Sequence, residues 1–194
     1  MRSVTCSMSV SLDGFIVGPD GRFDWSVPDE EVFRLATDEV RGLGVHLLGR
    51  RLYESMLYWE TADQDPSLDA AELEFAAIWN RLPKVVFSRT LSAVQGSHRL
   101  ADGALAAEVG RWRSEPGEGD IAIGGAGLVA EAAALDLIDE YRIRVYPVLV
   151  GGGTPLFPQA GQHVALELVE TRAFRSQVVF LRYRIAREAA AGSV

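Results

Sequence analysis

The sequence predicts an α/β fold in which helices flank a sheet and an antiparallel hairpin closes the chain. Two short apolar runs, residues 45–48 and 121–123, break at glycine and continue as helix-forming segments, which is the pattern of strand-to-helix turns. Near the end of the chain, residues 164–174 and 177–185 alternate between apolar and polar side chains across a two-residue connection, as in a hairpin.

Composition narrows the classes of function. A chain of 194 residues, 48% hydrophobic and 24% charged, is typical of one globular domain, which we expect over residues 1–186, followed by a flexible tail over residues 187–194. The net charge of −8 argues against nucleic acid or a membrane surface as partner. Cys6 is the single cysteine, so we expect neither an internal disulfide nor a zinc site. No leader and no apolar run of about 18 residues is visible, so we expect a soluble cytoplasmic protein.

The first expected strand, residues 4–12, leads into a loop that begins with Asp13. A carboxylate at the end of a core strand can face a pocket, although an aspartate there also suits a turn. A helix is expected over residues 29–41, because apolar residues recur there at helical spacing. The helix dipole also favours the acidic residues at its start. Asp29 is therefore either an ordinary first-turn charge or part of a site.

The strand expected at residues 45–48 ends at Gly49, Arg50 and Arg51. Arginines are unfavourable at the positive end of a helix unless they meet an anion there. They indicate a phosphate site; the alternative is that both are solvated surface residues.

The strand expected at residues 85–87 ends at Ser88 and Arg89. A hydroxyl and a guanidinium are the donors that a phosphate monoester needs. Because ligands of open α/β sheets bind across the carboxyl ends of the strands, we expect these groups to join those at the neighbouring strand end.

A glycine-rich turn follows the buried run at residues 121–123. Gly124, Gly125 and Gly127 permit a tight turn and a close approach of ligand to backbone, and the helix expected at residues 128–135 would point free amides at an anion. The pattern matches the dinucleotide fingerprint from Gly125 onward, but the next strand lacks the acidic residue of a standard Rossmann unit. A nucleotide-phosphate site and a purely structural turn both remain open.

The remaining elements follow the same rules. Helices are expected at residues 70–80 and 104–113, and a long strand at residues 140–150. Pro147 would interrupt the ladder of that strand, which favours an edge position or a bulge.

Taken in order, these segments resemble the dihydrofolate-reductase-like superfamily. The resemblance is stronger to the family of the reductase domain of the bifunctional riboflavin-biosynthesis deaminase-reductase, the RibD C-terminal domain, and its stand-alone relatives. It spans residues 3 to 185. The segments that carry it are residues 11–16 (SLDGFI), 48–54 (LGRRLYE), 86–90 (VFSRT), 123–127 (IGGAG) and 147–153 (PVLVGGG).

The resemblance implies a mixed, mostly parallel sheet flanked by helices, with a C-terminal antiparallel hairpin, and NADPH bound across the strand ends. By this resemblance, Ser88 and Arg89 read the adenosine 2′-phosphate, and Ile16 and Val17 lie near the nicotinamide. The implied phosphate-binding residues are Gly49, Arg50, Arg51, Gly124, Gly125, Ala126, Gly127 and Leu128. In dihydrofolate reductases the peptide equivalent to Gly124–Gly125 is cis. Many members of the family are homodimers, so we expect a homodimer.

The sequence indicates less about the substrate site than about the cofactor site. The proton that accompanies hydride transfer could come from Asp13, Asp29 or water, and Asp29 occupies a helix start that resembles the one with the folate-binding carboxylate of dihydrofolate reductases. An aromatic pocket for a flat substrate could be formed by Phe15, Trp25, Phe33, Tyr58 and Trp59, although core packing is the simpler explanation for any one of them.

Two departures from the related families limit the assignment. Residues 82–84 enter a strand directly, without the arginine that grips folate in dihydrofolate reductases, and the zinc-binding deaminase half of the bifunctional protein has no counterpart. We therefore expect an NADPH-dependent reductase of a small heterocyclic or ribosyl-type substrate. The alternatives are a dihydrofolate reductase and a protein that binds NADPH without catalysis.

Overall fold

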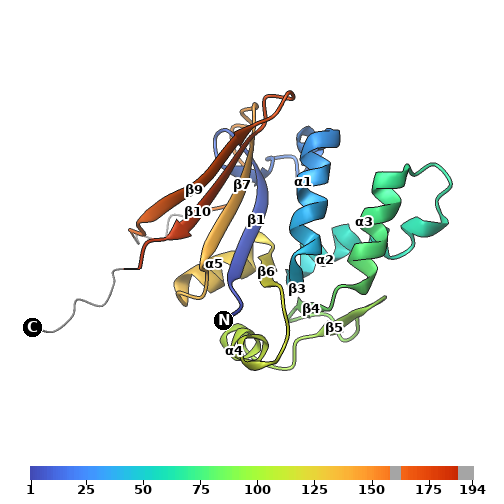
Figure 1. Cartoon of the computed structure of the whole chain (residues 1–194), viewed down its shortest axis with the longest axis vertical. Helices are drawn as coiled ribbons and strands as arrows, with labels where there is room; N and C mark the ends of the chain where they lie inside the picture. Colours follow the sequence, from blue (N-terminus) through green and yellow to red (C-terminus); the bar gives the residue numbers. More distant parts are fainter. Residues whose placement is uncertain (158–162, 188–194) are drawn as a thin grey trace, which may run out of the picture.

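The computed structural model describes residues 1–157 and 163–187, and its strands form two sheets (Figure 1). The strands are β1 (Val4–Ser11), β2 (Phe15–Val17), β3 (Leu43–Gly49), β4 (Lys84–Phe87), β5 (His98–Leu100), β6 (Asp120–Gly124), β7 (Glu140–Tyr146), β8 (Thr154–Pro155), β9 (Leu166–Ala173) and β10 (Val179–Ile185). Eight of them form one sheet in the order β5-β4-β3-β6-β1-β7-β10-β9, and β2 pairs with β8 separately.

The pairing directions confirm the predicted fold class. β1 runs parallel to β6 and β7, and β3 runs parallel to β4 and β6, with β5 parallel to β4 at the edge. β10 is antiparallel to both β7 and β9, so the predicted C-terminal hairpin extends the parallel sheet.

Helices cover both faces of the large sheet. They are α1 (Glu30–Arg41), α2 (Arg50–Met56), α3 (Ala70–Arg81), α4 (Leu105–Ser114) and α5 (Ala126–Ala134), with short 3-10 turns at Asp24–Ser26, Leu57–Glu60 and Ala62–Gln64. One core layer joins the sheet to α4 and α5 and includes Val4, Cys6, Val45, Leu47, Leu105, Val109, Ile121, Ile123, Leu128 and Val129. The layer on the opposite face joins it to α2 and α3 and includes Leu48, Tyr53, Phe75, Trp79 and Val86.

α1 is fixed to the sheet by polar contacts as well as by packing. Arg144 on β7 forms an ion pair with Glu39 on α1, and the Ser7 hydroxyl on β1 donates to Oε2 of the same carboxylate at 2.9 Å. All three side chains are at least partly buried, so each needs the others as partners. These contacts hold the last turn of α1 against β1 and β7.

The structure corrects three details of the sequence analysis. The strand expected at residues 140–150 ends at Tyr146, because Pro147 has no N–H for a ladder, and it lies between β1 and β10 rather than at an edge. The helix expected from residue 128 begins at Ala126. The short strands β2, β5 and β8 were not predicted, since two or three residues are too few to show a period.

Most of the tail expected at residues 187–194 lies outside the described residues. Arg187, its one described residue, donates Nη2 to Oδ1 of Asp139 at 2.7 Å.

Gly153 offers a test of the β2–β8 packing. Its φ is +112°, and a Cβ there would lie 2.1 Å from the carbonyl oxygen of Val17, whereas a Cβ at Gly110 in α4 would meet nothing within 4 Å. We expect Gly153→Ala to lower the free energy of unfolding by about 2 kcal/mol or more. Gly110→Ala, the control, should raise it by up to about 1 kcal/mol. Urea denaturation measures both, and an unchanged stability of Gly153→Ala would contradict the packing described.

Candidate functional site

The carboxyl ends of β3, β4 and β6 meet at one edge of the sheet. Gly49, the last residue of β3, is opposite Phe87 of β4, and Leu48 is opposite Gly124 of β6. The parallel pairing therefore brings together the three strand ends whose following residues were predicted to bind phosphate.

Backbone segments approach closely at this edge. A Cβ at Gly125 would lie 3.3 Å from Cα of Gly49, and a Cβ at Gly124 would lie 2.4 Å from Cδ2 of Leu52 and 3.0 Å from Nε2 of His46. A side chain at Gly124 would force Leu52 of α2 and the imidazole to move. These glycines thus form a cradle whose shape depends on the absence of side chains.

α5 begins in this cradle without a capping side chain. Gly125 precedes the helix with φ +96°, a conformation that favours glycine, and provides no side-chain cap. The first-turn amides of a helix lack backbone partners, so those of α5 are available to an anion. The cis peptide implied at Gly124–Gly125 is not present: this peptide is trans, and the positive φ of Gly125 makes the turn.

The cationic residues differ in their contacts. Arg50 donates Nε to Glu54 at 2.7 Å and Nη1 to the Thr90 hydroxyl at 2.8 Å, which links the start of α2 to the loop after β4. The Ser88 hydroxyl accepts the N–H groups of Thr90 and Leu91 at 3.2 and 3.1 Å and shapes that loop.

Two of the predicted phosphate ligands extend into solvent. Arg51 and Arg89 are both exposed. Arg51 is the second residue of α2, and Arg89 follows β4 by two residues, so both belong to segments that begin at this edge of the sheet.

Asp13 acts as a clamp for the glycine-rich loop after β7. Its carboxylate accepts the Ser11 hydroxyl at 2.6 Å and the N–H groups of Gly151 and Val150 at 2.8 and 3.2 Å. The Ser11 hydrogen bond, helped by the two backbone donors, holds the pKa of Asp13 below its usual range. A carboxylate held in this way is poorly suited to donate a proton.

The strand after Asp13 carries the two residues predicted near the nicotinamide. Ile16 packs against the larger core, and Val17 pairs with Thr154 of β8.

Asp29 lies at the mouth of a cavity of about 260 Å³ at the carboxyl end of β7. Its Oδ1 caps α1 by accepting the N–H of Val32 at 2.9 Å. The lining residues are Trp25, Val27, Asp29, Tyr146, Pro147, Val148, Ser176 and Val178. The rings of Trp25 and Tyr146 meet edge to face at 6.0 Å, and the buried indole N–H of Trp25 has no partner among the described residues.

The sequence analysis did not select Tyr146, Ser176 or Val178. They come from β7 and from the region between β9 and β10, and no local pattern indicates that these segments meet Asp29. Trp25 was among the aromatic residues predicted to form a substrate pocket, and it lines this cavity, whereas Phe15, another of them, lies in β2 opposite Pro155.

Phe33, Tyr58 and Trp59, also predicted as substrate residues, lie outside this cavity. Phe33 and Trp59 pack against Phe75, with ring centroids 5.5 and 4.6 Å away, in the core layer of α2 and α3. Tyr58 is 50% exposed and lies against Trp59 at 5.2 Å. Core packing accounts for Phe33 and Trp59, and neither they nor Tyr58 line the cavity beside Asp29.

A row of basic side chains lies beneath the cradle. His46, Lys84 and His98 occupy paired positions on β3, β4 and β5, and Glu60 lies 3.3 Å from Nζ of Lys84 and 3.6 Å from Nδ1 of His98. Burial, followed by the charges of Lys84 and His98, lowers the pKa of His46 to about 3. His46 is therefore neutral at physiological pH.

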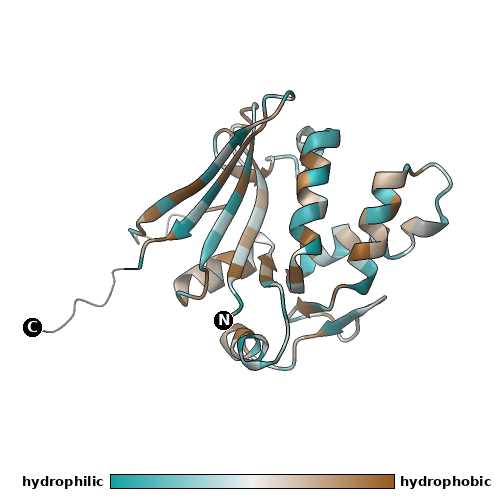
Figure 2. Ribbon diagram, viewed as in Figure 1, coloured by the Kyte–Doolittle hydropathy of each residue, from teal (hydrophilic) through white to brown (hydrophobic). Residues whose placement is uncertain are grey.

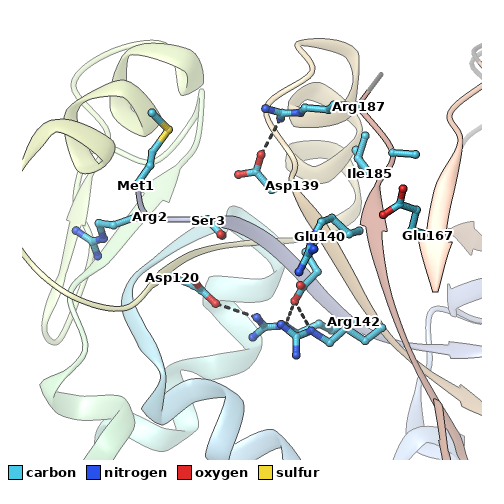
Figure 3. A pocket seen from close by; sticks show the side chains of 13 residues that line it. Met1, Arg2, Ser3, Asp120, Asp139, Glu140, Arg142, Glu167, Ile185 and Arg187 are labelled. Carbon is cyan, nitrogen blue, oxygen red and sulfur yellow. Dashed lines mark hydrogen bonds and ion pairs between the residues drawn. The ribbon is translucent and has the colours of Figure 1, made fainter. Parts of the chain in front are cut away.

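A larger cavity of about 470 Å³ lies at the opposite, amino end of β1 and β6 (Figure 3). Several of its charges are paired with one another: Arg142 donates to Asp120 and Glu140 at 2.8 and 2.6 Å, and Arg182 donates to Glu140 at 2.8 Å. Burial alone would raise the pKa of Glu140, but these arginines lower it. Ligands of open parallel sheets bind at the carboxyl ends of the strands, so we do not assign the cofactor to this cavity.

Two further findings concern residues 1–157 and 163–187. No cluster of three or more His, Cys, Asp or Glu side chains there could hold a metal ion. No helix in these ranges has both the length and the apolar character needed to cross a bilayer.

Comparisons with known proteins agree with this fold. The family model described as the RibD C-terminal domain matches residues 2–180. The chain is 31% identical over 182 residues to the uncharacterized protein YyaP of Bacillus subtilis (strain 168), and the match covers 94% of each protein.

The chain also shares its fold with solved structures of other proteins. A proposed riboflavin biosynthesis protein of Shewanella sp. PV-4 aligns with TM-score 0.75 and 23% identity, over 96% of this chain and 100% of that chain. A diaminohydroxyphosphoribosylaminopyrimidine deaminase/5-amino-6-(5-phosphoribosylamino)uracil reductase of Thermotoga maritima aligns with TM-score 0.65 and 14% identity, over 95% of this chain and 57% of that chain. At these identities the alignments show a shared fold.

The lowered pKa of His46 predicts an acid-sensitive stability. The unfolded chain binds a proton at this residue near its ordinary pKa, whereas the folded chain binds it only near pH 3, so the free energy of unfolding should fall as pH drops from about 6.5 towards 3. One such group contributes a slope of at most about 1.4 kcal/mol per pH unit. His46→Leu should reduce the slope measured by urea denaturation, while His163→Asn, at an exposed position, should leave it unchanged. Equal slopes for His46→Leu and the unmodified chain would contradict the assignment.

Proposed function

Since the chain belongs to the RibD C-terminal domain family, we propose that it is an NADPH-dependent reductase that transfers a hydride to a small heterocyclic or ribosyl-type substrate. The observation that carries the proposal is the glycine cradle of β3 and β6 beside the uncapped start of α5. A pyrophosphate needs backbone amides at close range, and Gly124 and Gly125 keep the turn between β6 and α5 free of side chains.

The residues at this edge fit the cofactor. The amides of the first turn of α5 would hold the pyrophosphate, with Gly127 exposed and open space where its Cβ would be. Arg51 is available as a further cation at the start of α2, while Arg50 shapes the site through Thr90.

Ser88 and Arg89 are the candidates for the adenosine 2′-phosphate. Arg89 is exposed beside the turn formed by the Ser88 hydroxyl, and a guanidinium binds a phosphate monoester in a bidentate manner. The cofactor, when bound, supplies the hydride, and the protein supplies orientation.

The cavity beside Asp29 is our candidate for the substrate site. Its aromatic wall of Trp25 and Tyr146 suits a flat ring. The Thermotoga maritima neighbour is named for reduction of a phosphoribosylaminouracil, a heterocycle of this type. Asp29 is the only carboxyl group among the residues that line the cavity, so we assign proton delivery to it.

Arg89→Ala tests the cofactor specificity. We expect at least about tenfold weaker binding of NADPH with little change for NADH, because only NADPH carries the 2′-phosphate. Fluorescence titration of the purified protein measures both. Arg34→Ala is a matched control, since Arg34 is exposed and pairs with Glu30 on α1. Equal losses for the two nucleotides would remove Arg89 from this role.

Asp29→Asn separates proton delivery from helix capping. Asparagine caps a helix as well as aspartate does, so stability should change little, while kcat should fall by about 10²-fold or more. Full activity of this variant would exclude Asp29 as the proton donor.

The reaction itself is tested by NADPH oxidation with pterins, dihydrofolate and pyrimidine ribosyl phosphates. Turnover of a ribosyl phosphate supports the proposal, and turnover of dihydrofolate alone identifies a dihydrofolate reductase. Tight binding of NADPH without turnover of any substrate would favour a non-catalytic binding protein.

A further inference from the structure

The loop between β4 and β5 carries Ser88 and Arg89, the candidates for binding the 2′-phosphate. β4 ends at Phe87 and β5 begins at His98, and residues 88–97 between them form neither helix nor strand. A loop without regular backbone pairing is held by side chains and by packing. The contacts of this loop therefore limit how far the guanidinium of Arg89 can move.

The first part and the middle of the loop are anchored next to α2. Arg50 of α2 donates Nη1 to the Thr90 hydroxyl at 2.8 Å, and the Ser88 hydroxyl accepts two N–H groups of the turn that follows it. Leu91 and Val94 are half-buried and pack against the core layer of α2 and α3. These apolar side chains fix the middle of the loop.

Tyr53 of α2 holds the last part of the loop. Its hydroxyl accepts the N–H of Gln95 at 2.9 Å, and Nδ1 of His98 lies 3.0 Å from the carbonyl oxygen of the same residue. The rings of Tyr53 and His98 meet edge to face at 4.8 Å, and both side chains are buried. The backbone N–H and C=O of Gln95 are thus paired with side chains that the core holds in place.

Glu60 holds the two residues that follow Gln95. Its Oε2 accepts the N–H of Ser97 at 3.0 Å, and a Cβ at Gly96 would collide with the same carboxylate. Gly96 also has φ +65°, a conformation that favours glycine. The backbone of the loop therefore packs directly against Glu60.

A buried lysine keeps Glu60 in position. Figure 2 shows hydrophobic segments in β3 and β4, yet Lys84 at the start of β4 is only 2% exposed. Its Nζ donates to the carbonyl groups of Trp79 and Leu82 and lies 3.3 Å from Oε1 of Glu60. A buried charge without a partner is costly, so Lys84 and Glu60 hold each other.

We propose that Tyr53 and Glu60 are positioning residues for cofactor selectivity, because they hold the loop of residues 88–97 so that Arg89 meets the 2′-phosphate of NADPH. This inference rests on the proposed function and extends it to side chains too buried to reach a ligand: Tyr53 is 4% exposed, and the Glu60 side chain is 11% exposed. A guanidinium that is already placed loses less conformational freedom on binding, which raises affinity. NADH carries no phosphate at this position, so its binding should not depend on the loop.

Tyr53→Phe tests the proposal by removing one oxygen. The ring remains against His98, and the acceptor of the Gln95 N–H is lost. We expect about three- to tenfold weaker binding of NADPH in a fluorescence titration, with the binding of NADH unchanged. Tyr183→Phe is the matched control, since Tyr183 lies on β10, far from β4 in the sheet order, and should change neither affinity.

A double-mutant cycle shows whether Tyr53 acts through Arg89. When Arg89→Ala is already present, Tyr53→Phe should cause no further loss of NADPH binding. Hydrogen exchange of the Gln95 amide should be faster in Tyr53→Phe, which checks the contact without any nucleotide. Additive losses in the two variants, or an unchanged affinity of Tyr53→Phe for NADPH, would overturn the positioning role of Tyr53.

Glu60→Gln tests the second positioning residue. Glutamine retains an acceptor for the N–H of Ser97 but leaves the charge of Lys84 without its partner, so the preference for NADPH over NADH should fall. Circular dichroism checks that the variant is folded. An unchanged preference in the folded variant would remove Glu60 from this role.

The outcomes also separate this inference from the proposed function. If the unmodified chain binds NADPH no more tightly than NADH, the proposed 2′-phosphate site is wrong, and the positioning role is wrong with it. If the unmodified chain prefers NADPH and Tyr53→Phe keeps the whole of that preference, the positioning role alone is wrong.

Discussion

The close approach of β3 and β6 at their carboxyl ends is the constraint on which the site depends. A Cβ at Gly125 would lie 3.3 Å from Cα of Gly49. A Cβ at Gly124 would collide with Leu52 and His46. Because the strands are parallel, every element that follows them begins on the same side of the sheet. α2, α5 and the loop after β4 therefore start at the same edge of the sheet, which brings their polar groups near one another.

The carboxylates of the molecule have distinct roles that follow from their partners. Asp13 accepts three hydrogen bonds and holds the loop after β7 in place, which favours its charged form. Asp29 uses one oxygen to cap α1 and also lines a cavity with two aromatic rings. Glu140 neutralises Arg142 and Arg182 at the far end of the sheet. Asp29 and Glu140 both line a cavity, but Glu140 already neutralises two arginines, whereas Asp29 shares its cavity with aromatic and aliphatic side chains and one serine.

The two ends of the sheet consequently differ in chemistry. At the amino end, Arg142 and Arg182 are paired with Asp120 and Glu140, so these charges of the cavity are already neutralised. At the carboxyl end, the start of α5 has no side-chain cap and Arg51 and Arg89 are exposed. Unsatisfied donors attract an anion, whereas paired ions have little to gain from one. The carboxyl end of the sheet is therefore the better candidate for cofactor binding.

The sequence by itself determined the secondary-structure elements longer than about five residues, the glycine turns and the hairpin, because periodicity and backbone preferences are properties of neighbouring residues. The position of Asp29 at the start of α1 could be predicted from the same local patterns. The tertiary structure decided which groups meet. That Asp13 holds Gly151, that Ser176 shares a cavity with Asp29, and that Phe33 and Trp59 belong to the core depends on packing between segments more than 15 residues apart in the printed sequence. The edge position predicted from Pro147 was wrong. A proline can also end a strand in the middle of a sheet, and only the strands that pair with β7 distinguish a central position from an edge.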